Sequence, residues 1–144
     1  MLKYHCFILA SLFLVSCSRT SVKKEKYENG TIKSEKTFER IDGKEHLVKE
    51  VQYHPNGKKY IEGGYKDDLR DGFWASWYDD GQLWSEGGFR NGKSHGRRTV
   101  YHPNGQKYYE GSFDMGKRTG VWVFYNEEGL KIKEVNYDSQ GTRP

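Results

Sequence analysis

The chain has 144 residues, of which 34% are hydrophobic, 31% charged and 15% aromatic. Its 24 basic and 20 acidic side chains are interleaved and leave a formal net charge of +4, which predicts a mixed, solvated surface and no nucleic-acid partner. The aromatic content excludes a disordered chain despite the mean hydropathy of -0.99, because disordered chains are poor in aromatic residues. The scarcity of aliphatic residues excludes a thick globular core and favours a thin repeat architecture.

In chain order, residues 1–16 are predicted to be a lipoprotein signal peptide. One cation, an apolar run from Phe7 to Val15 and the ending "LVSC" form a segment too short to span a membrane, since a span needs about 20 apolar residues. That ending resembles the lipobox of bacterial lipoproteins, with Leu14 and Ser16 in place before Cys17. The resemblance implies that the Cys17 thiol receives a diacylglycerol and becomes the first mature residue. An ordinary signal peptide followed by a cysteine of no consequence is the alternative.

Residues 17–26, which include the basic run "KKEK", are expected to form a flexible tether behind this anchor. Two or three acyl chains would hold the protein durably on a membrane. We therefore expect a lipid-anchored protein of the bacterial cell envelope. Ser18 follows the cysteine in place of an acidic residue, which in enteric-type sorting favours the outer membrane, facing the periplasm. Cys6 would be removed with the signal, so the mature chain would hold neither a free thiol nor a disulfide.

Residues 27–139 repeat with a period of 24. The positions that keep this step are four glycines, four glutamates and two aromatic columns: Gly57, Gly81, Gly105 and Gly129; Glu62, Glu86, Glu110 and Glu134; Tyr53, Trp77, Tyr101 and Tyr125; Tyr65, Phe89, Phe113 and Tyr137. The earliest unit, "YENGTIKSEKTF", fits the same template, but Gly30 precedes Gly57 by 27 residues. A three-residue insertion near Asp42 and Gly43 accounts for the difference. Residues 140–144 are a C-terminal tail.

Each unit is predicted to be one β-hairpin. "PNG" at 55–57 suits a three-residue hairpin loop with glycine in the left-handed conformation. Longer polar loops such as "DDLRDG" are expected at the other end, and strands rich in aromatic and β-branched residues lie between. The fold class is therefore all-β: a single-sheet antiparallel meander of stacked hairpins, with about nine strands between residues 31 and 138. Strict alternation would place Ile61, Gly63 and Tyr65 on one face and Tyr60, Glu62 and Gly64 on the other, with a ring lying over the bare glycine backbone.

The segment "EGSFDMGKRTGVWVFY" resembles the MORN family, and the spacing of its motifs resembles the bacterial MORN-variant proteins identified as YwqK-type antitoxins. The resemblance runs from about Tyr27 to Tyr137. It departs from the family pattern at Asp68, where the loop glycine is missing, and at Arg98, where tryptophan is replaced. It implies stacked hairpins and an antitoxin-like role.

No catalytic or metal site, and no cofactor, is predicted. His54 and His102 occupy the same turn position two units apart, about 19 Å by strand spacing, so they cannot share an ion and are expected to be exposed. The glutamate ladder suggests a hydrolase only weakly, because identical repeated carboxyls lack the asymmetry of an acid and a base. We expect these glutamates to satisfy backbone donors or to pair with lysine and arginine.

The candidate binding residues are an aromatic column and the glutamates expected beside it: Trp84, Tyr60, Tyr108, Glu62, Glu86 and Glu110. The sequence predicts a protein that binds an unknown envelope protein without catalysis, and its sharper form is an immunity factor against a toxin that reaches the periplasm. The alternative is carbohydrate or peptidoglycan binding through the exposed aromatic column. Open sheet edges leave self-association as a further expectation.

Overall fold

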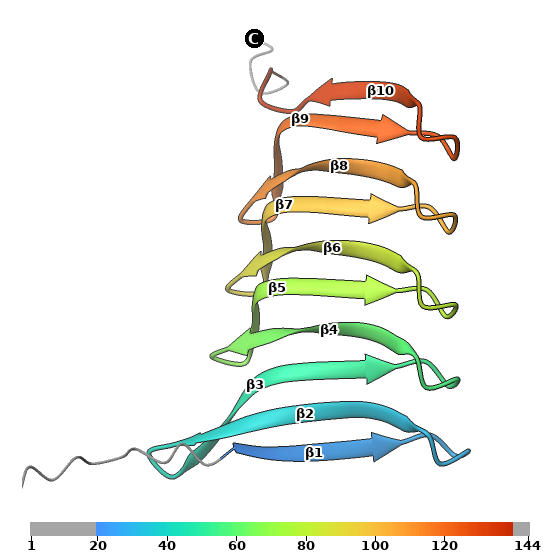
Figure 1. Cartoon of the computed structure of the whole chain (residues 1–144). Coiled ribbons are helices and arrows are strands. Elements are labelled where there is room, and N and C mark those ends of the chain that lie inside the picture. The colour runs from blue at the N-terminus through green and yellow to red at the C-terminus, as the bar shows by residue number, and fades with distance from the viewer. Residues whose placement is uncertain (1–19, 140–144) are drawn as a thin grey trace, which may run out of the picture.

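The protein is one antiparallel β-sheet in the computed structural model, which describes residues 20–139 (Figure 1). Its ten strands are β1 (Thr20–Lys26), β2 (Ile32–Ile41), β3 (Lys44–Tyr53), β4 (Lys59–Lys66), β5 (Leu69–Trp77), β6 (Leu83–Arg90), β7 (Lys93–Tyr101), β8 (Lys107–Asp114), β9 (Lys117–Tyr125) and β10 (Lys131–Asn136). Each strand pairs with its neighbours in sequence. The all-β meander of stacked hairpins is therefore confirmed.

The sheet begins earlier than the sequence predicted. Residues 20–26, assigned to a flexible tether, form strand β1, which pairs with β2 from Thr20 opposite Glu39 to Lys26 opposite Ile32. The tether prediction is wrong for these residues, and the count of about nine strands becomes ten. The predicted signal peptide, Cys17 and the tail at 140–144 lie outside the described residues.

Three-residue turns close the hairpins along one edge of the sheet. In the turn after β3, the Gly57 amide donates to the His54 carbonyl and the His54 amide donates to the Lys58 carbonyl. Gly57 has a φ of +84°, the left-handed conformation expected of it. The turns after β1, β5, β7 and β9 repeat the same two bonds, so the predicted turn chemistry holds in all five.

The opposite edge differs from the prediction, because its turns have two residues. Each pairs two positive-φ residues, as in Asn91 (+48°) and Gly92 (+76°) between β6 and β7, which is the combination of a type I′ turn. The rest of each predicted polar loop is already strand, and Gly72, with φ +77°, lies within β5 where the register shifts. That glycine marks a strand irregularity and not the end of a loop.

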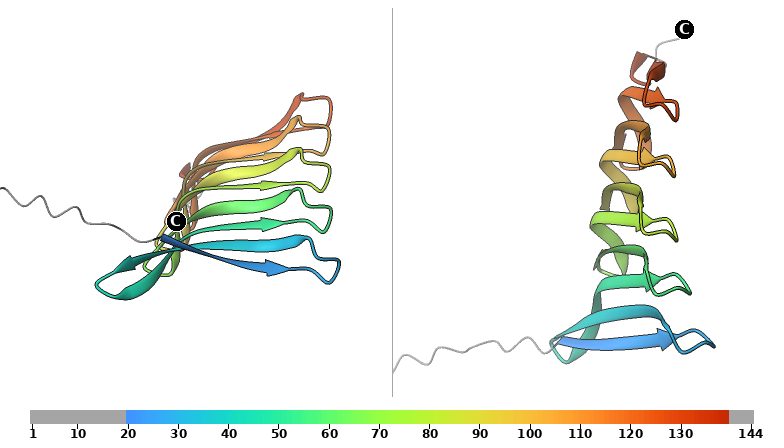
Figure 2. Two further views of the ribbon diagram at one scale, coloured as in Figure 1. Left: turned by 60° about the horizontal axis from the view of Figure 1, so that its bottom comes forward. Right: turned by 45° about the vertical axis from the view of Figure 1, so that its right-hand side comes forward.

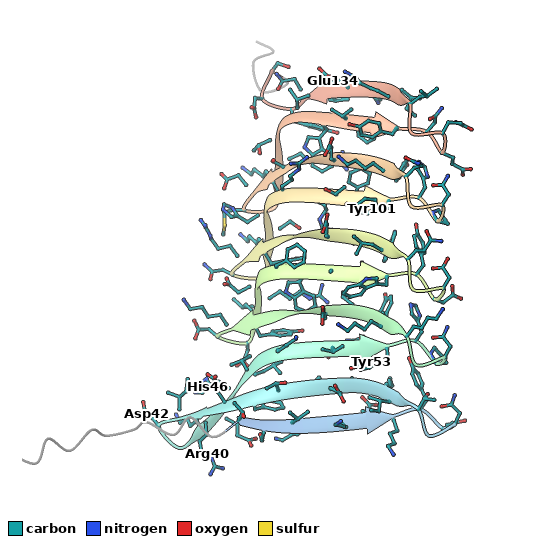
Figure 3. All side chains as sticks on the ribbon, in the orientation of Figure 1. Arg40, Asp42, His46, Tyr53, Tyr101 and Glu134 are labelled. Carbon is teal, nitrogen blue, oxygen red and sulfur yellow. The ribbon has the colours of Figure 1, made fainter. Side chains whose placement is uncertain are left out.

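The three-residue insertion lengthens one hairpin. β2 and β3 have ten residues each, against eight or nine in β4 to β9, and they meet at a turn of Asp42 and Gly43. Figure 3 shows Arg40, Asp42 and His46 in this extension, which projects beyond the other two-residue turns. The insertion is therefore absorbed without disturbing the stacking of later repeats.

The core of this single layer is built from tryptophans lying over glycines. Trp122 and Trp74 are 0% and 3% exposed. A Cβ added to Gly63 would come within 2.1 Å of the Trp74 indole, and one added to Gly111 within 2.3 Å of the Trp122 indole. Each indole nitrogen also donates to a backbone carbonyl, Trp74 to Gly64 at 3.0 Å and Trp122 to Ser112 at 3.2 Å. The ring over bare backbone expected from the sequence is thus present.

These tryptophans belong to a continuous spine that crosses the strands. Its members, in strand order, are Tyr65, Trp74, Phe89, Arg98, Phe113, Trp122 and Tyr137. Rings of the spine meet edge to face at 5.0–5.9 Å, a favourable aromatic geometry. Arg98 replaces the middle tryptophan, with its guanidinium 5.4 Å from the Phe89 ring and 5.9 Å from the Phe113 ring. A cation over two rings keeps the spine unbroken.

We predict that Asp68→Gly stabilises the protein by about 0.5 kcal/mol. Asp68 has a φ of +60° where the equivalent turns have glycine, so the substitution relieves left-handed strain, partly offset by the greater freedom of glycine in the unfolded chain. Gly92→Ala, at φ +76°, should change stability in the opposite direction. Urea unfolding of both variants measures the effects, and equal signs would refute the turn assignment.

We also predict that Gly111→Ala costs about 3 kcal/mol or more, because the new methyl group would overlap the Trp122 ring. Gly87→Ala is the matched control, because a Cβ there would meet the flexible side chain of Arg98 at 3.1 Å and backbone atoms of Arg97 and Arg98 no closer than 3.3 Å, and the loss should be less than half as large. Denaturant midpoints of the two variants provide the comparison. Similar losses would mean that indole-on-glycine packing is not what stabilises the sheet.

Candidate functional site

Both faces of the sheet are uncovered by any second layer within residues 20–139 (Figure 2). In the pairing of β5 with β6, Ala75 lies opposite Glu86 and Trp74 opposite Gly87. Since successive residues of a strand point to opposite faces, one face holds the spine and the other holds the glutamates. We call the first the tryptophan face (Trp74, Arg98 and Trp122) and the second the glutamate face (Glu62, Glu86, Glu110 and Glu134).

On the glutamate face, side-chain partners engage each carboxylate of the ladder. Glu62 pairs with Lys59 at 2.9 Å, and Glu134 pairs with Lys131. Glu86 accepts a hydrogen bond of 2.8 Å from the Tyr101 hydroxyl. The expected pairing with lysine or arginine is confirmed for Glu62, Glu110 and Glu134, whereas Glu86 is held by a tyrosine. Figure 3 shows Tyr53 at the same place in β3 as Tyr101 in β7, and its hydroxyl binds Glu35 in the same way.

Glu110 is the most strongly engaged carboxylate of the ladder. It accepts from Lys107 at 2.9 Å, from Arg97 at 2.5 Å and from the Tyr125 hydroxyl at 2.9 Å. Hydrogen bonds from Lys107, then from Arg97, lower its pKa to about 2, because they favour the charged form. The side chain is 17% exposed. This environment keeps Glu110 ionised as a structural anion.

We predict a pH dependence from this pKa. A folded-state pKa of about 2, below the ordinary value of 4.5, gives stability that is present above about pH 4.5 and lost as the pH falls through about 2. Glu110→Gln should therefore be less stable at neutral pH and should lose less stability between about pH 5 and pH 2 than the parent protein. Urea unfolding at several pH values measures this. Parallel curves for the two proteins would contradict it.

The exposed aromatic column forms a strip on the tryptophan face. Tyr60, Trp84 and Tyr108, the aromatic strip, are 38%, 41% and 45% exposed. Their repeat distance is about 10 Å, because two strands at about 4.8 Å separate successive members. Tyr108 lies 5.4 Å from the Tyr109 ring, which in turn stacks on Trp122 at 5.5 Å. The strip is therefore continuous with the spine.

The strip does not lie beside the glutamates, contrary to the sequence prediction. Tyr53 pairs with Lys59 and Gln52 with Ile61, which leaves Tyr60 as an extra residue in a bulge. The same shift skips Trp84 and Tyr108. A bulge interrupts the two-residue alternation, so these rings point to the tryptophan face. The structure brings the three aromatic candidates together and places Glu62, Glu86 and Glu110 on the other face.

Turn residues extend the strip toward the three-residue turns. His54 lies 5.0 Å from the Tyr60 ring, Tyr78 lies 6.1 Å from Trp84, and His102 lies 4.8 Å from Tyr108. A shallow groove of about 400 Å³ lies between the first two pairs, lined by His54, Tyr60, Trp77, Tyr78, Asp79 and Trp84. Rings with polar edges line a surface open to solvent.

The two histidines also link one repeat to the next. The Nε2 of His54 donates to the Trp77 carbonyl at 3.0 Å, and that of His102 donates to the Tyr125 carbonyl at 3.1 Å, so Nε2 carries the proton. Both are half-buried, and the prediction of exposed turn histidines is wrong. The sequence signal was the tyrosine Tyr78, which stands at the equivalent position in the repeat between the two histidines. Its hydroxyl makes the same bond, to the Tyr101 carbonyl at 2.8 Å.

Among residues 20–139, no group of three or more histidine, cysteine, aspartate or glutamate side chains could hold a metal ion. No helix in that range is long and apolar enough to cross a membrane. Cys17, the predicted lipidation site, lies outside the range. The described site is therefore a surface of rings and hydrogen-bonding groups.

The fold and this surface define a β-repeat protein. Three segments, residues 19–40, 48–67 and 94–115, match the family described as MORN repeat variant, which agrees with the sequence resemblance at these three repeats. A protein of unknown function from Bacteroides fragilis NCTC 9343, known from its crystal structure, is 11% identical over 83% of this chain and 93% of that chain. Its TM-score of 0.26 is too low to bear on function. No curated protein matches the chain.

Proposed function

We propose that the protein is a non-catalytic binding protein of the bacterial cell envelope, and that the aromatic strip is its contact surface for a partner protein. The observation that carries this proposal is the exposure of Tyr60, Trp84 and Tyr108 in one line over successive repeats. Aromatic residues dominate the binding energy of protein interfaces because they bury a large area with few rotatable bonds.

The packing around the strip supports the proposal. Each exposed ring packs against the side chain of a turn residue, His54, Tyr78 or His102. Each of these side chains donates a hydrogen bond to a backbone carbonyl of the next repeat. Rings held in this way lose little conformational entropy when a partner binds. Trp84 lies at the centre of the strip and is the residue we assign as its main anchor.

Anchoring through Cys17 is part of the same proposal. Strand β1 begins at Thr20, three residues after Cys17, so acylation there would hold the sheet within about 10 Å of the membrane surface, at about 3.4 Å per residue. A partner would then be an envelope protein or a toxin entering the periplasm, and the antitoxin-like role suggested by the YwqK-type resemblance would be an immunity function. The outer membrane is the proposed site.

The test is a photo-crosslinking amino acid placed at Trp84 in the full chain, expressed in its own host. We expect one dominant protein adduct, identified by mass spectrometry and absent when the crosslinker is placed at Phe73, which is 63% exposed on the opposite face. An adduct that forms equally from both positions, or none from either, would refute the assignment of the strip. Deletion of the predicted signal peptide and Cys17 tests the location separately. If the resulting cytoplasmic protein still protected the host against a toxin, the proposed immunity function in the periplasm would be refuted.

A glycan is the second candidate ligand, favoured by one observation. The strip repeats about every 10 Å, which is close to the length of a disaccharide unit in an extended β-1,4-linked glycan, and sugar rings stack on aromatic faces. Retention of the purified protein on insoluble peptidoglycan, lost in Trp84→Ala and kept in Phe73→Ala, would favour this candidate over a protein partner. Equal retention of both variants would eliminate it.

A further inference from the structure

The two ends of the sheet are open strand edges that fit one another. In residues 20–139, β1 pairs only with β2, and β10 pairs only with β9. The ten strands of the described residues form five whole hairpins, in which β1 is the first strand of the first hairpin and β10 is the second strand of the last. A β1 strand placed beside β10 would therefore run antiparallel to it, as β3 runs beside β2. Unpaired backbone groups at such edges are templates for another strand.

The rows of residues that cross the sheet specify one register for this contact. Glu134 ends the row of the glutamate ladder, opposite Val123, and Lys24 begins the same row, opposite Glu35. Extending that row from one copy to the next places Glu134 opposite Lys24 of a second copy. The adjacent row, which runs from Glu25 to Lys133, places Lys133 opposite Glu25 of the second copy.

We propose that copies of this chain associate head to tail, with β10 of one pairing with β1 of the next in this register. Two cross-strand pairs of opposite charge then form, one on each face. Two-fold pairing of β10 with itself about Lys133 would instead set Lys133 against Lys133, whereas pairing of β1 with itself about Lys24 would combine one Lys24–Lys24 contact with two Lys23–Glu25 pairs. Charges on edge strands usually oppose association, but those of β10 and β1 are complementary in the head-to-tail register.

Exposed apolar residues at the β10 edge add to this attraction. Leu130 and Ile132 are 64% and 63% exposed, more than the other large hydrophobic side chains of the described residues apart from Phe73. Ile132 follows Tyr108 at the 24-residue step and occupies the same bulge position in β10. An added strand would partly cover both side chains.

The resulting array is open, because the contact joins two different edges and each copy is displaced from the last along the direction in which the strands stack. Each copy would add about 48 Å, ten strands at about 4.8 Å. Every copy would present Thr20, the start of β1, along the same edge of the array as the two-residue turns. That arrangement is compatible with the proposed lipid anchor but does not depend on it.

The test is disulfide trapping of the purified full chain in detergent. Val135 and Lys23 lie at the two ends of the cross-strand row that contains Trp74 and Trp122, and the proposed register places them opposite each other across the contact. Cross-strand partners have the Cα separation that a disulfide needs. We expect the double variant Lys23→Cys/Val135→Cys to give a ladder of dimers, trimers and longer species on oxidation, which collapses with reductant. With Cys6 and Cys17 replaced by serine in every variant, each single variant can give no more than dimers.

Two controls separate this register from random contact. Lys23→Cys/Lys131→Cys is out of register and should give no more than its single variants do. In the trapping variant, Lys133→Glu should reduce the ladder, and adding Glu25→Lys should restore it. A ladder that is no longer than that of the single variants, or that is indifferent to both charge changes, would overturn the proposal. No partner is present in this experiment, so its outcome is independent of the proposed function.

Discussion

A sheet of one layer has no second layer to bury its apolar side chains, and this constraint shapes the protein. The large apolar side chains are buried within the sheet itself, where the indole of a tryptophan on one strand lies against the glycine backbone of the neighbouring strand. Trp122 is 0% exposed, because Gly111 lies against its ring while the Arg118 guanidinium and the rings of Tyr109, Phe113 and Tyr137 surround the rest. Glycine at Gly63 and Gly111 is required by this contact, because any side chain would occupy the space of the ring. Burial of the indoles by glycine backbone and by neighbouring rings and arginines explains how a chain with few aliphatic residues folds.

The second element of the architecture is a chain of bonds between the turns. Tyr27, His54, Tyr78 and His102 each donate to a carbonyl at the end of a strand in the following repeat. Asn56 and Asn104 add bonds of 2.7 Å from one turn to the next. Each repeat is therefore held by its neighbours alone, as in other repeat proteins. The same bonds fix the spacing of the exposed rings, so the surface proposed for binding is a consequence of the way the sheet is stabilised.

Much of the fold could be predicted from periodic residues. The 24-residue step of Gly57 and its equivalents identified the hairpins, and the "PNG" turn was correct in detail. Strand β1 was missed because "TSVKKEK" has no aromatic residue and reads as a charged tether; it is a strand because β2 provides a partner and Lys24 pairs with Glu35 at 2.6 Å. Gly72 was predicted to end a loop, but it lies within β5, because a glycine with positive φ occurs at strand irregularities as well as in loops.

The sequence identified the three aromatic candidates as equivalent residues, but it did not predict their arrangement. Alternation placed Tyr60 with Glu62, whereas a bulge that adds one residue moved the ring to the opposite face. Such a shift depends on pairing across strands, which no single strand reveals. The role of His54 was hidden for the same reason, since its acceptor lies 23 residues away in the next repeat. Sequence periodicity identifies equivalent residues, and only register decides which of them meet.

The most direct measurement is hydroxyl-radical footprinting of the protein in intact host cells and after purification. The account predicts that oxidation of Trp84 and Tyr60 falls in cells, because a partner covers the aromatic strip, while oxidation of Phe73 on the glutamate face is unchanged. Equal rates of Trp84 oxidation in cells and in the purified protein, or protection confined to Phe73, would contradict the claim that this strip is the binding surface.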